Sequence, residues 1–472
     1  MRVATLIEHS AELIRIIFNS SQPVDRILST YFRSKKQYGS KERKFSVNTI
    51  YLVLRNYLLF EFIGKNIQNE IQVDKSDEQI KILIAITLTS NFPNFTKSYS
   101  PDELIINIEK TETSESILQS ILGENLAKFK QTISTTFEEL NKKVKEIDFY
   151  NFGSVDYQLI QNRYSFPAFF LEKIINSFRN RSELMNFLEN SIEQAPLVLR
   201  VNTLKTTTEH IEKNFNEQNI PLQKSIVIPN CFYSSNRIQL SEIPAYKNGE
   251  IEVQEEGSQL ISLILSPKAN EEILDACAGA GGKTIHIGDL QKNQGLIIAN
   301  DIEFKRLKEI PKRAQRAGLT SVITYISNSK KNNFKEILKL TKEHLFHRVL
   351  IDAPCTGSGT IRRDPLKKFR INEKILKKIN LNQIKILENY SKFVRINGFL
   401  VYSTCSLIPD ENEFIVEQFL ENNPNFIPVN ILEDIDISIN TNFLRIHQNQ
   451  VNIDFRNTIS DGFFMAKMMR ID

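Results

Sequence analysis

The chain has 472 residues and a nearly balanced charge, with 60 Lys and Arg against 56 Asp and Glu and a formal net charge of +4 at pH 7. Its length favours two to four domains over a single hydrophobic core, and no apolar run approaches the roughly 20 residues that span a bilayer. We therefore expect a cytoplasmic protein with neither a signal peptide nor a membrane partner.

Residues 1–145 are predicted to form an all-α domain. In SVNTIYLVLRNYLLF, residues 46–60, apolar side chains recur at helical spacing. In SDEQIKILIAITL, Ser76 and Gln79 have the spacing of a capping box. Residues 33–44 hold six Lys or Arg against the single acid Glu42. Such a cluster is typical of a solvated face or of a nucleic-acid-binding surface.

Two further domains are predicted after this one. Residues 150–265 mix helical and extended segments, which indicates a small α/β module. Over residues 266–472 apolar strands alternate with helical segments, and this alternation predicts a doubly wound, mostly parallel sheet. The expected strands are EEILDAC, GLIIAND, SVITYIS, HRVLIDA and GFLVYST. Pro311 predicts an interruption in the helical segment 303–318.

The turn DACAGAGGKT, residues 275–284, joins the first of these strands to a helix. Its ending resembles a phosphate-binding loop, but the pattern G-x-x-x-x-G-K-[ST] requires a glycine where Cys277 stands. The dinucleotide pattern G-x-G-x-x-G also fails, because Thr284 occupies the third glycine position. The glycines still let the backbone approach a ligand closely, so the turn predicts a ligand site that does not require pyrophosphate.

Ligands of an open parallel sheet bind beyond the carboxyl ends of its strands. The second strand ends at Asp301, which can accept hydrogen bonds from ribose hydroxyls or cap a helix. Cys355 and Cys405 stand at neighbouring strand ends, and Asp352 precedes the first of them by three residues. Most free cysteines are small buried hydrophobes, but a pair at neighbouring strand ends beside a carboxylate favours catalysis. The chain has no CxxC pair, which predicts neither a disulfide framework nor a metal.

Two thiols beside a carboxylate and a nucleoside-bearing ligand suit a particular reaction. Carbon 5 of a cytosine becomes nucleophilic when a group adds to carbon 6, and a thiolate makes that addition reversibly. A carboxyl group facing N3 and the exocyclic amine would hold the base. The activated carbon 5 could then take a methyl group from S-adenosylmethionine, and a second thiol could assist when the first is expelled.

Four segments, in this order, resemble the successive motifs of the bacterial and nucleolar RNA (cytosine-5) methyltransferases: ILDACAGAGGKT, LIIANDIEFKRL, VLIDAPCTGSGTIRRDP and LVYSTCSLIPDENE. LRVNTLK and VQEEGSQL resemble that family's small α/β RNA-binding module, and SDGFFMAKM resembles its closing strand. The resemblance implies a Rossmann-like, S-adenosylmethionine-dependent methyltransferase domain over residues 266–472. KERKFSVNTIYLVLRNYL resembles the NusB-like RNA-binding domain of the branch that modifies small-subunit ribosomal RNA, which implies such a domain for residues 1–145.

The resemblance also implies a role for each site residue. Cys405 would be the nucleophile, Cys355 would assist product release, and Asp352 would hold the base at the edge of the cofactor site. Asp301 would bind the ribose, and Asn328 stands where the family usually has an Asp toward the adenine. The methionine part of the cofactor would be wrapped by Cys277, Ala278, Gly279, Ala280, Gly281, Gly282 and Lys283.

A basic run follows the Pro-Cys motif and predicts phosphate contacts near the target base. Its residues are Arg362, Arg363, Lys367, Lys368 and Arg370. We expect a monomeric enzyme whose cofactor is S-adenosyl-L-methionine and whose partner is RNA, above all 16S ribosomal RNA. Three alternatives stay open: transfer RNA as the substrate, a non-catalytic RNA-binding or ribosome-assembly factor, and an amino-group methyltransferase for which Cys405 would be dispensable.

Overall fold

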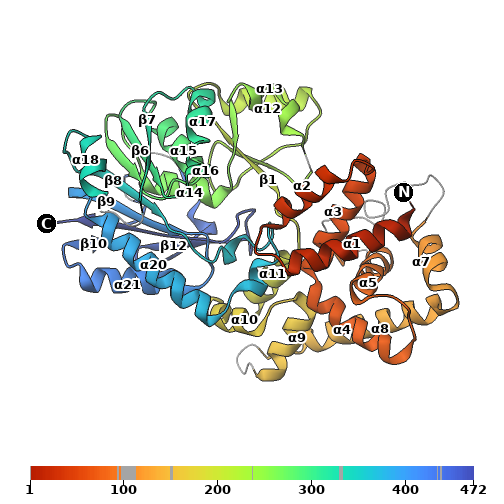
Figure 1. Cartoon of the computed structure of the whole chain (residues 1–472). Coiled ribbons are helices and arrows are strands. Elements are labelled where there is room, and N and C mark those ends of the chain that lie inside the picture. Colours follow the sequence, from red (N-terminus) through yellow and green to blue (C-terminus); the bar gives the residue numbers. More distant parts are fainter. Residues whose placement is uncertain are drawn as a thin grey trace. The chain divides into compact units, whose positions relative to one another are not determined.

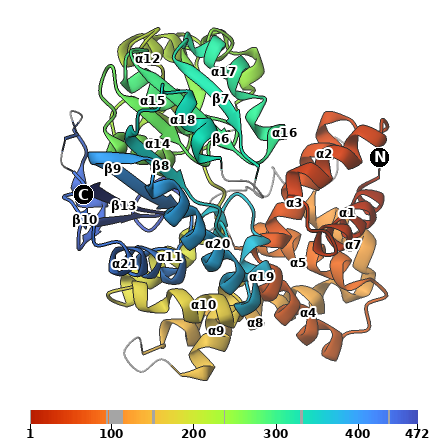
Figure 2. The same cartoon turned by 60° about the vertical axis from the view of Figure 1, so that its left-hand side comes forward.

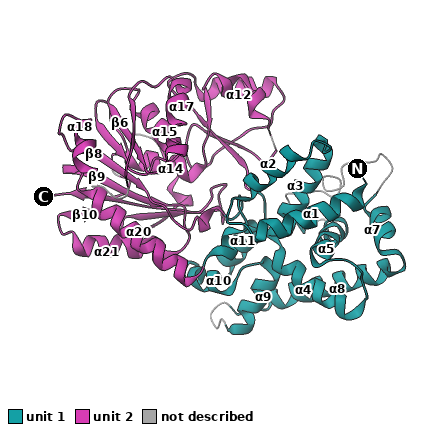
Figure 3. Ribbon diagram, viewed as in Figure 1, with its two compact units in different colours: residues 1–194, 361–371 teal, residues 195–360, 372–472 magenta. Residues whose placement is uncertain are grey.

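The structure is a computed structural model, and it describes residues 2–92, 95–96, 113–148, 153–236, 238–328, 333–432, 434–435 and 438–472 (Figure 1). The chain divides into two compact units, residues 1–194 with 361–371 and residues 195–360 with 372–472 (Figure 3). The predicted module 150–265 is therefore divided between the units, because its first helices belong to one unit and its strands to the other. Residues 149–152, near the first predicted boundary, lie outside the described residues.

The first unit is built from helices over its described residues. They are α1 Val3–Phe18, α2 Val24–Ser34, α3 Ser40–Arg55, α4 Tyr57–Glu70, α5 Asp77–Asn91, α7 Ser114–Leu122, α8 Leu126–Lys145, α9 Ser154–Tyr164, α10 Ala168–Ile174, α11 Arg181–Ser191 and α19 Lys367–Arg370. The predicted capping box is present at α5, where Gln79 N donates to Ser76 Oγ and Ser76 N donates to Gln79 Oε1 at 2.9 Å. Among the described helices of the whole chain, none is both long and apolar enough to cross a lipid bilayer.

The segment 361–371 belongs to this helical unit although it follows the Pro-Cys motif in the sequence. Lys368, on α19, is only 2% exposed. Its ammonium group donates hydrogen bonds to the carbonyl oxygens of Arg55 at 3.1 Å and Tyr164 at 3.3 Å. Lys368 thus binds the segment to carbonyl groups at the ends of α3 and α9, and burial, followed by the charge of Arg55, lowers its pKa well below the ordinary value.

The second unit contains a large sheet with the strand order β11-β12-β13-β9-β8-β5-β6-β7, in which β10 pairs with β13. The strands are β5 Glu272–Asp275, β6 Leu296–Asp301, β7 Val322–Ile326, β8 Phe346–Asp352, β9 Val394–Thr404, β10 Phe426–Pro428, β11 Arg445–His447, β12 Gln450–Ile453 and β13 Phe463–Arg470. All pairs from β7 to β9 are parallel, and β13 joins β9 antiparallel. The predicted doubly wound, mostly parallel sheet is confirmed.

Helices cover both faces of this sheet (Figure 2). They are α14 Glu256–Leu265, α15 Gly282–Leu290, α16 Phe304–Leu307, α17 Ile310–Ala317, α18 Phe334–Lys339, α20 Glu373–Ser391 and α21 Glu413–Asn422. Along β8, Val349 and Ile351 pack in a core with α18, α20 and α21, whereas Leu350 packs in a core with α14 and α15. Such alternation is typical of a strand that is buried on both faces. Pro311 lies in the first turn of α17, so the predicted interruption is confirmed.

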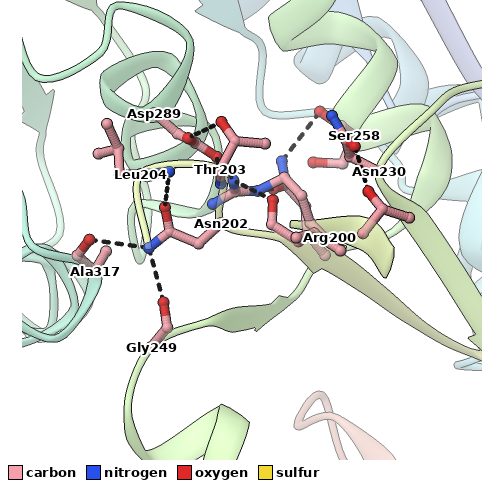
Figure 4. A network of polar contacts seen from close by, with 12 residues as sticks. Arg200, Asn202, Thr203, Leu204, Asn230, Gly249, Ser258, Asp289 and Ala317 are labelled. Carbon is pink, nitrogen blue, oxygen red and sulfur yellow. Dashed lines mark hydrogen bonds and ion pairs between the residues drawn. The ribbon is translucent and has the colours of Figure 1, made fainter. Parts of the chain in front are cut away.

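A smaller antiparallel sheet of the same unit has the order β2-β3-β1-β4. Its strands are β1 Leu197–Val201, β2 Gln223–Lys224, β3 Cys231–Ser234 and β4 Ile251–Val253, and its helices are α12 Thr208–Glu217 and α13 Pro244–Lys247. The buried guanidinium of Arg200 pairs with Asp289 of α15, and Asn202 Nδ2 donates to the carbonyls of Gly249 at 2.7 Å and Ala317 at 2.9 Å (Figure 4). Removing one member of a buried pair typically costs about 3–5 kcal/mol, so the LRVNTLK segment fixes the small sheet to the large one.

Candidate active site

The glycine turn between β5 and α15 leaves room for a ligand against its backbone. Gly279 and Gly281 have positive φ values of 56° and 81°. A Cβ atom at Gly281 would lie 2.7 Å from Ile310 Cγ1, so a side chain is excluded there. At Gly279 and Gly282 a Cβ atom would meet no heavy atom within 4 Å. The backbone of the predicted cofactor turn is therefore open at Gly279 and Gly282, which leaves room there for the S-adenosylmethionine that the motifs imply.

Asp301, at the end of β6, fixes this turn. Its Oδ2 accepts a hydrogen bond from Gly279 N at 2.8 Å, and its Oδ1 accepts one from Glu303 N at 2.7 Å. The predicted helix cap is wrong for Asp301, because Glu303 is the N-cap residue of the following helix α16 and no side chain caps that helix. A carboxylate has about four acceptor positions, so the predicted contact with ribose hydroxyls fits the same group.

Asn328 follows β7 and is exposed. Its backbone N–H donates to Asn333 Oδ1 at 3.1 Å, and its carbonyl accepts from Asn333 Nδ2 at 2.9 Å.

The buried side chain of Asn300 also contacts the glycine turn, but the sequence did not predict it, since a single Asn beside Asp301 carries no motif. Its Nδ2 donates to the carbonyl of Ala276 in the turn and to the hydroxyl of Tyr390, both at 2.8 Å.

The two cysteines at the strand ends meet. The parallel register of β8 and β9 places Asp352 opposite Ser403, and beyond these residues the sulfur atoms of Cys355 and Cys405 approach to 3.3 Å. Both are partly exposed free thiols. The hydrogen bond to Cys405, and then burial, raise the pKa of Cys355 well above its ordinary value. Either sulfur atom can donate the hydrogen bond between them.

Lys283 and Asp352 form an ion pair beside the thiols, with Nζ and Oδ2 2.7 Å apart. Ser403 Oγ donates to the other carboxylate oxygen at 3.2 Å. Burial lowers the pKa of Lys283, but the carboxylate of Asp352 outweighs it and raises that pKa overall, with a smaller contribution from Cys405. The motif alone predicted a contact of Lys283 with the cofactor, whereas the structure adds Asp352 as its partner.

The third cysteine near the site is the first residue of the predicted cofactor turn. Burial raises the pKa of Cys277 well above its ordinary value, so its thiol stays neutral. Among the described residues, no three His, Cys, Asp or Glu side chains are grouped as a metal ion would require. Cys355 and Cys405 are accordingly the thiols that the geometry brings to the reaction centre.

The basic run 362–370, which was predicted to bind phosphates, belongs to the first unit, and some of its side chains are buried whereas others are exposed. Arg362 is 6% and Lys368 2% exposed, and this burial contradicts the predicted phosphate contacts for these two side chains. Arg370 donates to the carbonyl of Ser20 at 2.7 Å. Arg363 is exposed and Lys367 half-buried. The charge run could be read from the sequence, but the residues that Lys368 contacts lie 313 and 204 positions earlier, at the ends of α3 and α9.

The sheet order, the glycine turn and the pair of thiols define a Rossmann-like, S-adenosylmethionine-dependent methyltransferase domain. Residues 262–469 match the family model described as 16S rRNA methyltransferase RsmB/F. This match confirms the resemblance of the motifs in these residues to those of the RNA cytosine-C5 methyltransferases.

The similar proteins are ribosomal RNA methyltransferases. The human 28S rRNA (cytosine(4447)-C(5))-methyltransferase is 32% identical over 323 residues, which cover 65% of this chain and 38% of that protein. The ribosomal RNA small subunit methyltransferase B of Pasteurella multocida is 30% identical over 308 residues, covering 65% of each chain. The structure of a methyltransferase homologue from Pyrococcus horikoshii is 27% identical with a TM-score of 0.55, and the match covers 67% of this chain and 100% of that one. The chain thus spans 38% and 65% of the lengths of these two curated relatives.

Proposed function

We propose that the protein transfers a methyl group from S-adenosylmethionine to carbon 5 of a cytosine in RNA. The observation that carries this proposal is the 3.3 Å approach of the Cys355 and Cys405 sulfur atoms beside the Lys283–Asp352 pair. Methylation of an amino group needs no thiolate, because the nitrogen is itself a nucleophile. The two thiols therefore favour a carbon as the acceptor, in keeping with the names of both curated relatives.

Cys405 is the nucleophile in this proposal. The ammonium group of Lys283 interacts with the Cys405 sulfur, and the S–H group of Cys355 would donate to that sulfur once Cys405 is ionised, so that both favour a thiolate. The sulfur bonds to carbon 6, and the electron pair of the C5–C6 double bond makes carbon 5 nucleophilic. Asp352 accepts hydrogen bonds from the exocyclic amine, and from N3 once that nitrogen is protonated, through acceptor positions left beside Lys283 and Ser403. S-adenosylmethionine supplies, when bound in the glycine turn, an electrophilic methyl group for carbon 5.

Release of the product uses the second thiol. Carbon 5 loses its proton to water, the C5–C6 double bond forms again, and the bond between carbon 6 and sulfur breaks with its electron pair on Cys405. The S–H group of Cys355 donates to that sulfur and stabilises it as a leaving group. The two cysteines thus have different tasks in this proposal.

Alanine variants of the two cysteines test this division. Purified protein is incubated with labelled S-adenosylmethionine and unmodified RNA, and the products are separated on denaturing gels and by nucleoside analysis. We expect Cys355→Ala to accumulate a covalent protein–RNA adduct and Cys405→Ala to give neither adduct nor product. A Cys405→Ala variant that still labels RNA would exclude the thiol mechanism and favour an amino-group acceptor.

Small-subunit ribosomal RNA is the substrate in this proposal. It is supported by the helical first unit, whose sequence resembles a NusB-like RNA-binding domain, and by the likeness to the Pasteurella enzyme. Unmodified small-subunit RNA and a pool of unmodified transfer RNA are compared at equal concentration. Labelling of transfer RNA alone would overturn this choice, and labelling of neither RNA by a protein that binds the cofactor would favour a non-catalytic assembly factor.

A further inference from the structure

The loops that carry Cys355 and Cys405 are not held in place by the strand pairing of the sheet. The paired residues of β8 and β9 end at Asp352 and Ser403, before either cysteine is reached. Cys355 lies in the loop that leads to the short 3₁₀ helix η4 Ser358–Thr360, and Cys405 precedes η5 Pro409–Glu411. A sulfur–sulfur approach of 3.3 Å therefore depends on contacts between the loops.

One buried carboxylate joins the residues that follow the two cysteines. Glu411 is 0% exposed. Its Oε1 accepts a hydrogen bond from the backbone N–H of Thr356 at 2.8 Å, and its Oε2 accepts from the hydroxyls of Thr356 and Ser406. Thr356 directly follows Cys355, and Ser406 directly follows Cys405. Glu411 thus holds both loops at positions adjacent to the sulfur atoms.

The residue after Glu411, Asn412, binds the residues on either side of Cys405. Asn412 accepts a hydrogen bond from Thr404 Oγ1 through its Oδ1 and donates from Nδ2 to the carbonyl of Ser406 at 3.0 Å. Gln383 of α20 donates to Glu411 Oε1 at 3.2 Å. Hydrogen bonds to a buried carboxylate are among the stronger ones, so this network orders both loops.

The carboxylate also sets an electrostatic difference between the thiols. Beyond the hydrogen bond between the two sulfur atoms and burial, the charge of Glu411 raises the pKa of Cys355. The ammonium group of Lys283 interacts with Cys405. A carboxylate that acts on one thiol and an ammonium group that acts on the other both favour Cys355 as the donor between the two sulfur atoms.

We infer that Glu411 is a positioning residue, which aims the S–H group of Cys355 at the sulfur of Cys405 for release of the methylated base. The inference rests on the proposed function. When the bond between carbon 6 and Cys405 breaks, its electron pair stays on the Cys405 sulfur and the S–H group of Cys355 donates to it. A change at Glu411 therefore slows release more than it slows addition to carbon 6.

The test compares Glu411→Gln, Thr356→Val and Ser406→Ala in the full chain. Glu417→Gln is the matched control, because this glutamate lies exposed on α21 a few residues away. For each variant we measure the rate of adduct formation, the fraction of protein bound covalently to RNA at steady state, and the turnover to 5-methylcytosine. Thermal unfolding of each variant shows whether it is folded.

We expect Glu411→Gln to lower turnover on the order of tenfold while the covalent fraction rises several-fold above wild type. Thr356→Val loosens the loop of Cys355 alone and is expected to raise the covalent fraction too, whereas Ser406→Ala is expected to slow adduct formation. Glu417→Gln is expected to match wild type.

Three results would overturn the inference. The first is wild-type turnover and covalent fraction in Glu411→Gln and Thr356→Val. The second is a parallel fall of adduct and product in proportion to the folded fraction, since a residue that only stabilises the fold acts in that way. The third is a wild-type protein that neither forms an adduct nor methylates RNA, and this result alone also removes the proposed function.

Discussion

Asp275 ends β5 with a carboxyl group that is 1% exposed. Its Oδ2 accepts a hydrogen bond from Thr284 Oγ1 at 2.7 Å, and its buried Oδ1 has no hydrogen-bond partner among the described residues. Burial raises the pKa of Asp275 from 3.8 to about 7, although the hydrogen bond from Thr284 and the charge of Lys283 act in the opposite direction. At neutral pH this side chain is therefore a source of instability beneath the glycine turn.

Asp275→Asn is expected to stabilise the protein at pH 8 but not at pH 4. The pKa of Asp275 is higher in the folded than in the unfolded chain, so the stabilising effect of its proton is complete below about pH 4 and disappears as the pH rises through about 7. The asparagine keeps the acceptor for Thr284 and never ionises. We expect a gain of roughly 4 kcal/mol at most at pH 8, measured by urea unfolding as the difference in unfolding free energy between the variant and wild type at the two pH values. An equal difference in unfolding free energy at both pH values would contradict the raised pKa of Asp275.

At the scale of elements, local sequence patterns predicted the sheet and the turn that carries the site. The apolar run of β8 and the glycine turn identify the sheet, and the register of parallel strands then brings Cys355 and Cys405 together. Contacts that join distant segments could not be predicted. Glu411 stands six residues after Cys405 within the Thr-Cys-Ser motif segment, but its bond to Thr356 exists only in the folded loops.

The contact between the two sheets of the second unit also joins segments that lie far apart in the sequence. Arg313, on α17, donates from Nη1 to the carbonyl of Ala280 in the glycine turn at 2.7 Å, and its Nη2 lies 3.1 Å from the carboxylate of Glu252 in β4. Glu252 is buried and also pairs with Arg316. The guanidinium group of Arg313 therefore links a strand of the small sheet to the turn that is predicted to bind the cofactor.

Arg313→Met is expected to weaken cofactor binding, because Ala280 loses a donor that orders the turn. A hydrogen bond from a charged group typically contributes about 1.5–3 kcal/mol, so the Kd should rise on the order of tenfold or more. Isothermal titration with S-adenosylmethionine measures this effect. Arg316→Met is the control, since Arg316 also pairs with Glu252 but directs its guanidinium to that carboxylate and not to Ala280. Equal losses in both variants would show that the effect is one of general stability.

At the scale of the whole molecule, the chain leaves the second unit after Thr360 and returns to it at Asn372. The segment between them belongs to the helical unit, as does the basic cluster 33–44 that was predicted from its composition. Both basic segments of the sequence analysis are therefore carried by one unit, which the spacing of their residues could not reveal. This supports the helical unit as the main source of cations for RNA phosphates.

Neutralising exposed cations of this unit is expected to flatten the salt dependence of RNA binding. Lys36 and Lys44 are exposed, and the removal of each phosphate contact should reduce the slope of log K against log salt concentration by about 0.7 to 0.9. Fluorescence anisotropy of a labelled small-subunit RNA fragment, titrated at several salt concentrations, gives this slope for Lys36→Gln with Lys44→Gln in the full chain. Lys392→Gln, at an exposed lysine of the second unit, is the control and should leave the slope unchanged. An unchanged slope in the double variant would remove these two lysines from the RNA-binding surface, and a reduced slope in Lys392→Gln as well would show that RNA phosphates contact both units.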